Sequence, residues 1–338
     1  MATKKQTIKK KLVKPVKKNN STTRKFGLYI AGVLILAIIG IIFFTLLKPG
    51  TSRSENRHLM NSGNMAIVQC MKNPSFPQKF GLNPPYAIDL KQDMFSKGMK
   101  IIEATTGKIL QLPGWDSFGY LGLYTRDDVG NIYTSPVPYV SIKFNSPEDQ
   151  NRILRVDNNT GVMQEFIRLP SVNKPTQKNP YGVIGLGFDC ETKSLYATSV
   201  SGSSFDKETG KVYQINPVTK EIIDTYDDFD ALGIALYVGV DGKRAYLGHA
   251  RKPDIYSVGI NEDGSFKNDL RFEFSLVDVP NGSYNKAHRI TIQDDVMTLK
   301  TREFSYTLIT ASDVMRTVYK FSYDRNEGKW KFNELAEE

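Results

Sequence analysis

The sequence predicts an all-β fold, a β-propeller of about five four-stranded blades, or six, preceded by one N-terminal transmembrane helix. Three observations predict it: an uncharged apolar run behind a basic leader, a hairpin pattern that returns about every 55 residues, and apolar, glycine-containing runs ahead of the hairpins. The composition, with 40% hydrophobic and 24% charged residues, is typical of a folded globular chain.

Residues 1–25 form a basic tail that carries ten Lys or Arg and no acid. The rest of the chain holds 35 basic and 36 acidic residues, so the net charge of +9 belongs to the tail. This distribution argues against nucleic acid as a partner. The tail either only sets the membrane topology or also attracts anionic lipid.

The uncharged run "FGLYIAGVLILAIIGIIFFTLL" fills residues 26–47. At about 1.5 Å per residue a helix of this length spans about 33 Å, enough to cross a bilayer. The run is longer than the apolar region of a cleaved signal peptide. We therefore expect a signal anchor held in membrane lipid by residues 26–47. The N-terminus would be cytoplasmic, 48–63 a juxtamembrane linker, and 64–338 an extracytoplasmic propeller of a single-pass cell-membrane protein.

The hairpin pattern pairs two β-branched or aromatic runs across a turn of Gly, Asn, Asp or Thr-Lys. Its five copies lie at 99–114, 152–170, 211–226, 254–276 and 317–335. Four copies follow an apolar pair of runs, such as "VIGLGFD" and "SLYATSV" at 183–200. Four strands per repeat of 40–55 residues indicate propeller blades.

The first run of each unit is predicted to be the innermost strand, where blades converge and bulky side chains would clash. Gly122, Gly185, Gly187 and Gly233 suit that crowding, and the aspartates that follow these runs are interpreted as turn formers. In the first unit, 64–70 and 86–92 are candidate strands, and 71–84 could hold a fragment of a sixth blade.

Two phrases resemble known propellers: "DGKRAY" at 241–246 and "GKVYQINPVTKEI" at 210–222. They are similar to blade sequences of the NHL, YVTN and SMP-30/gluconolactonase-like superfamily. The resemblance covers about 210 residues, is strongest in the third and fourth units, and implies the fold rather than an activity.

Long loops on a rigid scaffold often carry function. The longest connections are expected on one face, which we call the loop face, and they are 113–119, 135–150, 170–182, 199–210, 248–254 and 279–289. Its candidate residues fall into two groups. Candidates for catalysis are His249, His288, Asp116 and Asp230. Candidates for ligand binding are Trp115, Tyr181, Arg251, Tyr284 and Arg289, in which the aromatic rings could bind a sugar or peptide or could plug the channel.

An SMP-30-like lactonase would need an acid, an Asn and an Asp at the entry ends of inner strands to hold calcium or another divalent cation. The inner strands offer no acid there, and Asp116 and Asp230 are the nearest. No metal site or cofactor is therefore assigned. The sequence also lacks HExxH, GxSxG, Walker and CxxC motifs.

The two cysteines, Cys70 and Cys190, would lie beyond the membrane, where an oxidising exterior allows a disulfide. They fall in the first and third units, which are not neighbours in a simple ring. Two free thiols are therefore expected.

These features predict a membrane-anchored binding or scaffold module for an extracytoplasmic protein or small molecule. The alternative is an SMP-30-like metal-dependent hydrolase or lactonase that acts at the channel mouth.

Overall fold

The computed structural model describes residues 70–90, 97–138, 145–171, 173–307 and 316–337. The chain divides into two units, Met1–Gly63 and Asn64–Glu338, and every described residue belongs to the second. The predicted tail, transmembrane segment and linker lie outside the described residues. Within the described ranges, no helix is both long and apolar enough to cross a bilayer.

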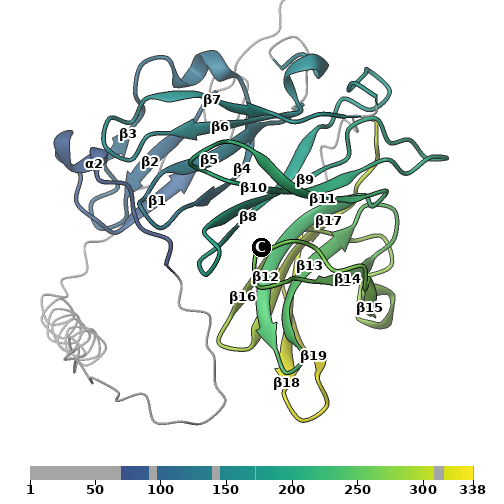
Figure 1. Cartoon of the computed structure of the whole chain (residues 1–338). Helices are drawn as coiled ribbons and strands as arrows, with labels where there is room; N and C mark the ends of the chain where they lie inside the picture. Colours follow the sequence, from purple (N-terminus) through teal and green to yellow (C-terminus); the bar gives the residue numbers. More distant parts are fainter. Residues whose placement is uncertain (1–69, 91–96, 139–144, 172, 308–315, 338) are drawn as a thin grey trace, which may run out of the picture. The chain divides into compact units, whose positions relative to one another are not determined.

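Five antiparallel sheets follow one another along the chain (Figure 1). In each of the last four sheets, consecutive strands lie side by side in chain order, as in a propeller blade. The second sheet comprises β4 Leu121–Arg126, β5 Ile132–Pro136, β6 Arg152–Val156 and β7 Met163–Arg168. The third comprises β8 Val183–Asp189, β9 Ser194–Ser199, β10 Lys211–Ile215 and β11 Ile222–Asp227.

The fourth sheet comprises β12 Ala231–Gly239, β13 Gly242–His249, β14 Asp254–Gly259 and β15 Arg271–Ser275. The fifth comprises β16 Lys286–Gln293, β17 Val296–Arg302, β18 Thr317–Asp324 and β19 Lys329–Glu337. In the described parts of the connections, short 3-10 helices lie at Trp115–Phe118, Pro147–Asp149 and Leu276–Asp278. The predicted hairpins and strand pairs of these four units are confirmed.

The first sheet contains three strands within the described residues, β1 Tyr86–Asp89, β2 Lys100–Glu103 and β3 Ile109–Leu110. Its β2–β3 hairpin matches the outer hairpin of the other blades, so β1 corresponds to a second strand. The inner strand predicted at 64–70 lies outside the described residues except for Cys70. The predicted sixth-blade fragment at 71–84 instead contains the short helix α2, Phe76–Lys79.

A hydrophobic cluster fills the space between each sheet and the next, which identifies the sheets as five blades. Each cluster contains residues of two successive sheets, for example, in chain order, Ile101 and Leu154, Tyr133 and Leu195, Val212 and Ala245, and Tyr246 and Phe321. The second, third and fourth sheets each have a neighbouring sheet on both faces. Both of their faces are therefore buried, which a single sheet could not achieve alone.

The inner strands are crowded against the backbone of the next blade at two of the four predicted glycines, Gly185 and Gly233. A Cβ added at Gly185 would lie 2.4 Å from the carbonyl oxygen of Leu232 in the next blade. At Gly233 it would lie 3.0 Å from the carbonyl oxygen of Ala287. At Gly187 the nearest atom would be 3.5 Å away, which is ordinary contact, so the crowding prediction was wrong there.

The aspartates at the ends of β4 and β8 form turns, as predicted. Asp127 accepts hydrogen bonds from the backbone N–H groups of Val129, Gly130 and Asn131. Asp189 accepts from the hydroxyl of Thr192 at 2.7 Å. Such side-chain bonds to a residue's own turn stabilise the reversal of the chain.

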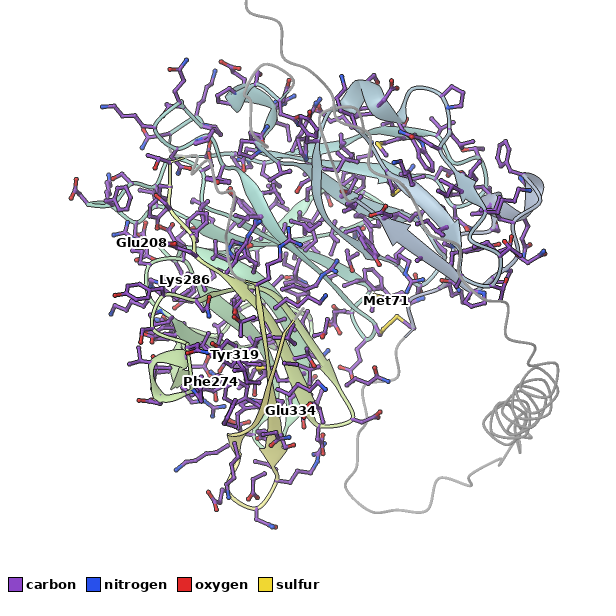
Figure 2. The ribbon with its side chains drawn as sticks, turned by 180° about the vertical axis from the view of Figure 1, so that it is seen from behind. Met71, Glu208, Phe274, Lys286, Tyr319 and Glu334 are labelled. Atoms are coloured by element: carbon purple, nitrogen blue, oxygen red, sulfur yellow. A yellow bond between two sulfur atoms is a disulfide. The ribbon has the colours of Figure 1, made fainter. Side chains whose placement is uncertain are left out.

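Cys70 and Cys190 form a disulfide, with Cα atoms 5.6 Å apart, so the expectation of two free thiols was wrong. The bond lies beside Met71 (Figure 2). The segment that contains Cys70 lies outside the first blade. The backbone N–H of Lys72 donates to the carbonyl of Asp127 in the second blade, so this segment crosses the end of that blade and reaches Cys190 in the third.

Candidate functional site

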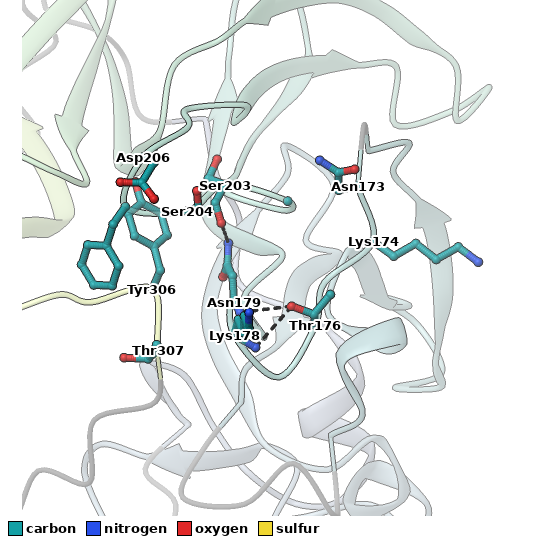
Figure 3. A pocket seen from close by; sticks show the side chains of 12 residues that line it. Asn173, Lys174, Thr176, Lys178, Asn179, Ser203, Ser204, Asp206, Tyr306 and Thr307 are labelled. Carbon is teal, nitrogen blue, oxygen red and sulfur yellow. Dashed lines mark hydrogen bonds between the residues drawn. The ribbon is translucent and has the colours of Figure 1, made fainter.

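A cavity of about 430 Å³ opens on the loop face between three connections (Figure 3). Its walls come from the segment before β8, the segment after β9 and the segment after β17. The lining residues are Asn173, Lys174, Thr176, Lys178, Asn179, Gly202, Ser203, Ser204, Phe205, Asp206, Tyr306 and Thr307. Lys174 extends away from the other lining side chains in Figure 3. We call this cavity the loop pocket.

Asn179 fixes the wall between the first two connections. Its side-chain amide donates to the carbonyls of Val200 and Ser203, each at 2.8 Å. Its side-chain oxygen accepts from the backbone N–H of Tyr181 at 3.1 Å. Because both ends of the buried amide are used, the two loops hold one geometry.

Asp230 lies directly behind the pocket and is fully buried, with 0% exposure. Its carboxylate accepts hydrogen bonds from the Ser203 hydroxyl, the Tyr306 hydroxyl and the backbone N–H of Gly210. Burial raises the pKa of Asp230 above its usual range, while the hydrogen bonds from Ser203 and Tyr306 oppose the shift. One carboxylate thus joins loops of the third and fifth blades.

Arg251 completes this arrangement from the fourth blade. Its Nε lies 3.4 Å from Asp230 and 3.1 Å from the Tyr306 hydroxyl, and its guanidinium lies over the Tyr306 ring. Its two terminal nitrogens donate to the carbonyls of Ser204 at 2.7 Å and Phe205 at 3.0 Å. The guanidinium therefore fastens the pocket wall to the buried carboxylate.

Phe205 is the aromatic side chain that the pocket presents to solvent. It is 66% exposed, and its ring meets the buried ring of Tyr306 edge to face at 5.6 Å. An exposed aromatic residue held at a pocket rim provides apolar contact area with few rotatable bonds to order on binding.

His249 is buried beside the network, against the rings of Phe229 and Tyr256. Its Nδ1 accepts from the backbone N–H groups of Arg251 at 2.9 Å and Lys252 at 3.2 Å. The proton of the neutral ring is therefore on Nε2, which lies 3.6 Å from Glu208. Burial lowers the pKa of His249 to about 4. This geometry leaves the ring no free lone pair with which to accept a proton.

An aromatic and aliphatic cluster fills the region where β8 and β12 begin. Ile184, Leu232 and Tyr306 form it, with Tyr181 and Phe304 packed against them. The rings of Tyr181 and Phe304 are 5.2 Å apart. This packing favours a role for Tyr181 in plugging the channel over a role in ligand binding.

His288 contacts Phe304 on the fifth blade, with ring centroids 5.8 Å apart. Its Nε2 is buried and lacks a hydrogen-bond partner among the described residues. Burial lowers the pKa of His288 well below its usual value. The two histidines thus contact different groups.

The remaining candidates are dispersed. Trp115 is buried in the core and donates its Nε1 hydrogen to the carbonyl of Gly161 at 2.9 Å. Asp116 follows Trp115 in the same 3-10 helix and is exposed. Tyr284 is 78% exposed on the loop before β16. Arg289 lies over the ring of Tyr124 at 5.3 Å. The three aromatic candidates therefore have different surroundings, with Trp115 buried, Tyr181 packed on Phe304 and Tyr284 exposed.

The structure adds residues that the sequence did not single out. Ser203, Phe205 and Asn179 lie in loops that were expected to carry function, but no motif distinguishes them there. Tyr306 lies in a connection after β17 that was not among the expected loops. Only the fold brings its hydroxyl to Asp230, 76 residues away.

The described residues do not fit the divalent cation that an SMP-30-like lactonase would need. The residues that directly precede β4, β8 and β16 are Tyr120, Gly182 and Asn285, so Asp230, before β12, is the one acid among them. In the described ranges, no three His, Cys, Asp or Glu side chains gather closely enough to share a metal ion.

No protein-family model matches the sequence, and neither does any curated protein. Among solved structures, a luciferin-regenerating enzyme is 11% identical with a TM-score of 0.46, covering 81% of this chain and 78% of that one. A chain of a nidogen/laminin complex is 9% identical with a TM-score of 0.45, covering 71% and 72%. A protein from Lactobacillus plantarum is 12% identical with a TM-score of 0.40, covering 74% and 80%. The order of the strands in each sheet and the packing of each sheet on the next identify the propeller.

Proposed function

We propose that the chain is a single-pass membrane protein that displays its β-propeller outside the cytoplasm and binds a small molecule or protein segment in the loop pocket. The observation that carries this proposal is the construction of the pocket wall. Arg251 fastens the carbonyls of Ser204 and Phe205 to the buried Asp230, so the cavity is held open before a ligand arrives. Such preorganisation lowers the entropic cost of binding.

Two observations support a location outside the cytoplasm. The basic tail and the apolar run at 26–47 favour a cytoplasmic N-terminus. The disulfide between Cys70 and Cys190 suits an oxidising compartment, because cytoplasmic reductants keep most thiols reduced.

Binding is favoured over hydrolysis by the state of the candidate catalytic groups. The Nδ1 lone pair of His249 is occupied by backbone N–H groups. The carboxylate of Asp230 is occupied by hydroxyl, amide and guanidinium donors. Neither group is placed to take a proton from a substrate or a water molecule.

Ligand binding can be tested on the detergent-solubilised chain with a panel of oligosaccharides and short peptides, scored by the rise in melting temperature. Phe205→Ala and Asn173→Ala should abolish a rise that the wild type shows. Tyr284→Ala is the matched control, since it removes an exposed aromatic ring of the loop face outside the pocket. A ligand that still stabilises both pocket variants binds elsewhere, and the loop pocket would lose its role.

Chelation separates binding from the hydrolase alternative. We expect the melting temperature to be unchanged by EDTA and elemental analysis to find no stoichiometric calcium or zinc. A bound divalent cation and a fall of several degrees on chelation would instead support the hydrolase.

The topology can be tested with protease added to intact cells or spheroplasts. We expect the propeller to be digested outside and the basic tail to be protected. A protected propeller would contradict the proposed location.

A further inference from the structure

The backbone carbonyls along one wall of the loop pocket are already engaged. The Ser203 carbonyl accepts a hydrogen bond from the side-chain amide of Asn179 at 2.8 Å. The carbonyls of Ser204 and Phe205 accept from Arg251 at 2.7 Å and 3.0 Å. A peptide that binds in extended form pairs with a row of unpaired backbone groups. Because this stretch of the described chain presents no such row of carbonyls, the ligand of the pocket must be recognised by side chains.

Three polar side chains that line the pocket remain available to a ligand: those of Asn173, Lys178 and Asp206. All three residues are exposed, and within the described ranges their side chains take part in no hydrogen bond or ion pair. An anionic ligand would meet the carboxylate of Asp206, and a cationic ligand would meet the ammonium of Lys178. A neutral ligand with several hydroxyl groups suits both, because a hydroxyl can donate to the carboxylate and accept from the ammonium or the amide.

Phe205 provides the apolar part of the pocket rim. Its ring is 66% exposed and lies edge to face with the ring of Tyr306 at 5.6 Å. The hydrogen bond from Arg251 to the Phe205 carbonyl holds the backbone from which the ring projects. A flat apolar ring beside polar side chains suits a ligand with one hydrophobic face and hydroxyl groups around it. A sugar ring has this form, since C–H groups lie on its faces and hydroxyls project from its rim.

Gly202 fixes the position of Asn173 in the pocket wall. Figure 3 shows Asn173 and Asp206 on opposite sides of Ser203. Gly202 has a φ of +82°, and a Cβ added to it would lie 2.8 Å from the Asn173 Cβ and 2.9 Å from the Asn173 carbonyl oxygen. The loop after β9 therefore touches the loop before β8 at this point, and only glycine leaves enough room. An alanine there would displace Asn173 without removing any side chain from the pocket.

We propose that the loop pocket binds a neutral mono- or disaccharide, which stacks on Phe205 and forms hydrogen bonds with the three available polar side chains. The cavity of about 430 Å³ lies near the lower end of the range for small-molecule sites. A longer saccharide would extend past the rim into solvent. The inference rests on the proposed function, since it names the ligand class of the same pocket.

Isothermal titration calorimetry on the full-length chain tests the ligand class, in a detergent whose head group is not a sugar. The probes are maltose, cellobiose, lactose and diacetylchitobiose, each titrated at about 50 and about 500 mM sodium chloride. We expect at least one to bind, with an affinity that salt leaves unchanged because the ligand carries no charge. Saturation-transfer NMR should then give its strongest signals at C–H groups on one face of a sugar ring.

Four variants test the contacts within the pocket. Phe205→Ala should weaken binding about tenfold, and Phe205→Trp should restore it, because either aromatic ring can stack on the sugar. Gly202→Ala should also weaken binding, since it displaces Asn173. Tyr284→Ala is the matched control, because it removes an exposed aromatic ring outside the pocket and should leave the affinity unchanged. Should Phe205→Ala not fold, Asn173→Ala takes its place and should lower the affinity.

Three results would overturn the inference: none of the four saccharides binds, binding is equally tight in Phe205→Ala and wild type, or the affinity falls steeply with salt. Titration with short peptides and free amino acids separates this failure from failure of the proposed function. If one of them binds and Phe205→Ala abolishes its binding, the pocket keeps its role with another ligand class. If none binds either, the proposed function fails together with the inference.

Discussion

Replacing His249 by Asn should remove a specific part of the pH dependence of folding stability. His249 is buried and neutral, and its Nδ1 accepts two backbone N–H groups. An Asn side-chain oxygen can occupy nearly the same position as Nδ1, so this variant keeps the acceptor and loses the titrating ring. His249→Leu, which loses both, is the comparison that isolates the acceptor.

The magnitude follows from the shift in pKa. Burial lowers the pKa of His249 from 6.5 to about 4. The negative charges of Asp230 and Asp254 oppose this shift, whereas the positive charges of Lys252 and Arg251 add to it. Because the folded pKa is the lower one, the unfolded chain binds more protons between pH 6.5 and 4. The contribution of the neutral His249 ring to folding stability is therefore fully present above pH 6.5 and is lost as the pH falls toward 4. A shift of this size corresponds to about 3 kcal/mol.

Urea unfolding of a fragment of residues 61–338, measured at several pH values from 4 to 7.5, would supply the test. Wild type should lose about 3 kcal/mol more than His249→Asn between pH 6.5 and 4. Asp230 titrates in the opposite sense, since its pKa is raised, but it is present in both proteins and cancels in the difference. Parallel stability curves for the two proteins would refute the buried, neutral histidine.

Three further effects should be visible in the same unfolding assay. Gly107 and Gly161 share a φ of +74°, but an added Cβ would meet nothing within 4 Å at Gly107 and would lie 2.5 Å from Leu112 at Gly161. Gly107→Ala should cost about 1 kcal/mol and Gly161→Ala about 2–4 kcal/mol, and equal costs would contradict the packing. Tyr306→Phe keeps the ring but loses the hydrogen bond to a buried carboxylate, so we expect a loss of about 1.5–3 kcal/mol and no change if that bond is absent. Cys190→Ser opens a loop of 120 residues and should cost about 2–5 kcal/mol under non-reducing conditions, with no difference from wild type once both are reduced.

The blades could be predicted from sequence because their determinants are local and repeated. A strand pair and its turn lie within about twenty residues, and the same pattern returns in each unit, so five weak signals support one another. The outer turns illustrate this. Each closes at a residue with positive φ, which is glycine in four blades and Lys220 in the third.

The disulfide was not predictable by the same reasoning. Sequence position assigns Cys70 to the first blade, and neighbouring blades are the expected partners. Its actual partner depends on how the segment from 70 to 75 crosses the second blade. Backbone hydrogen bonds such as that from Lys72 to Asp127 determine that path, and these do not depend on residue type.

Asp127 and Asp230 differ in how far the sequence alone predicts their roles. Both are buried, at 3% and 0% exposure, and both have a carboxylate that accepts several hydrogen bonds. The donors to Asp127 lie within the next six residues, so the sequence alone indicates a turn former. The donors to Asp230 lie from 20 to 76 residues away, in loops of three blades. Propeller symmetry places these loops on one face but leaves their lengths and paths free, and those lengths and paths create the loop pocket.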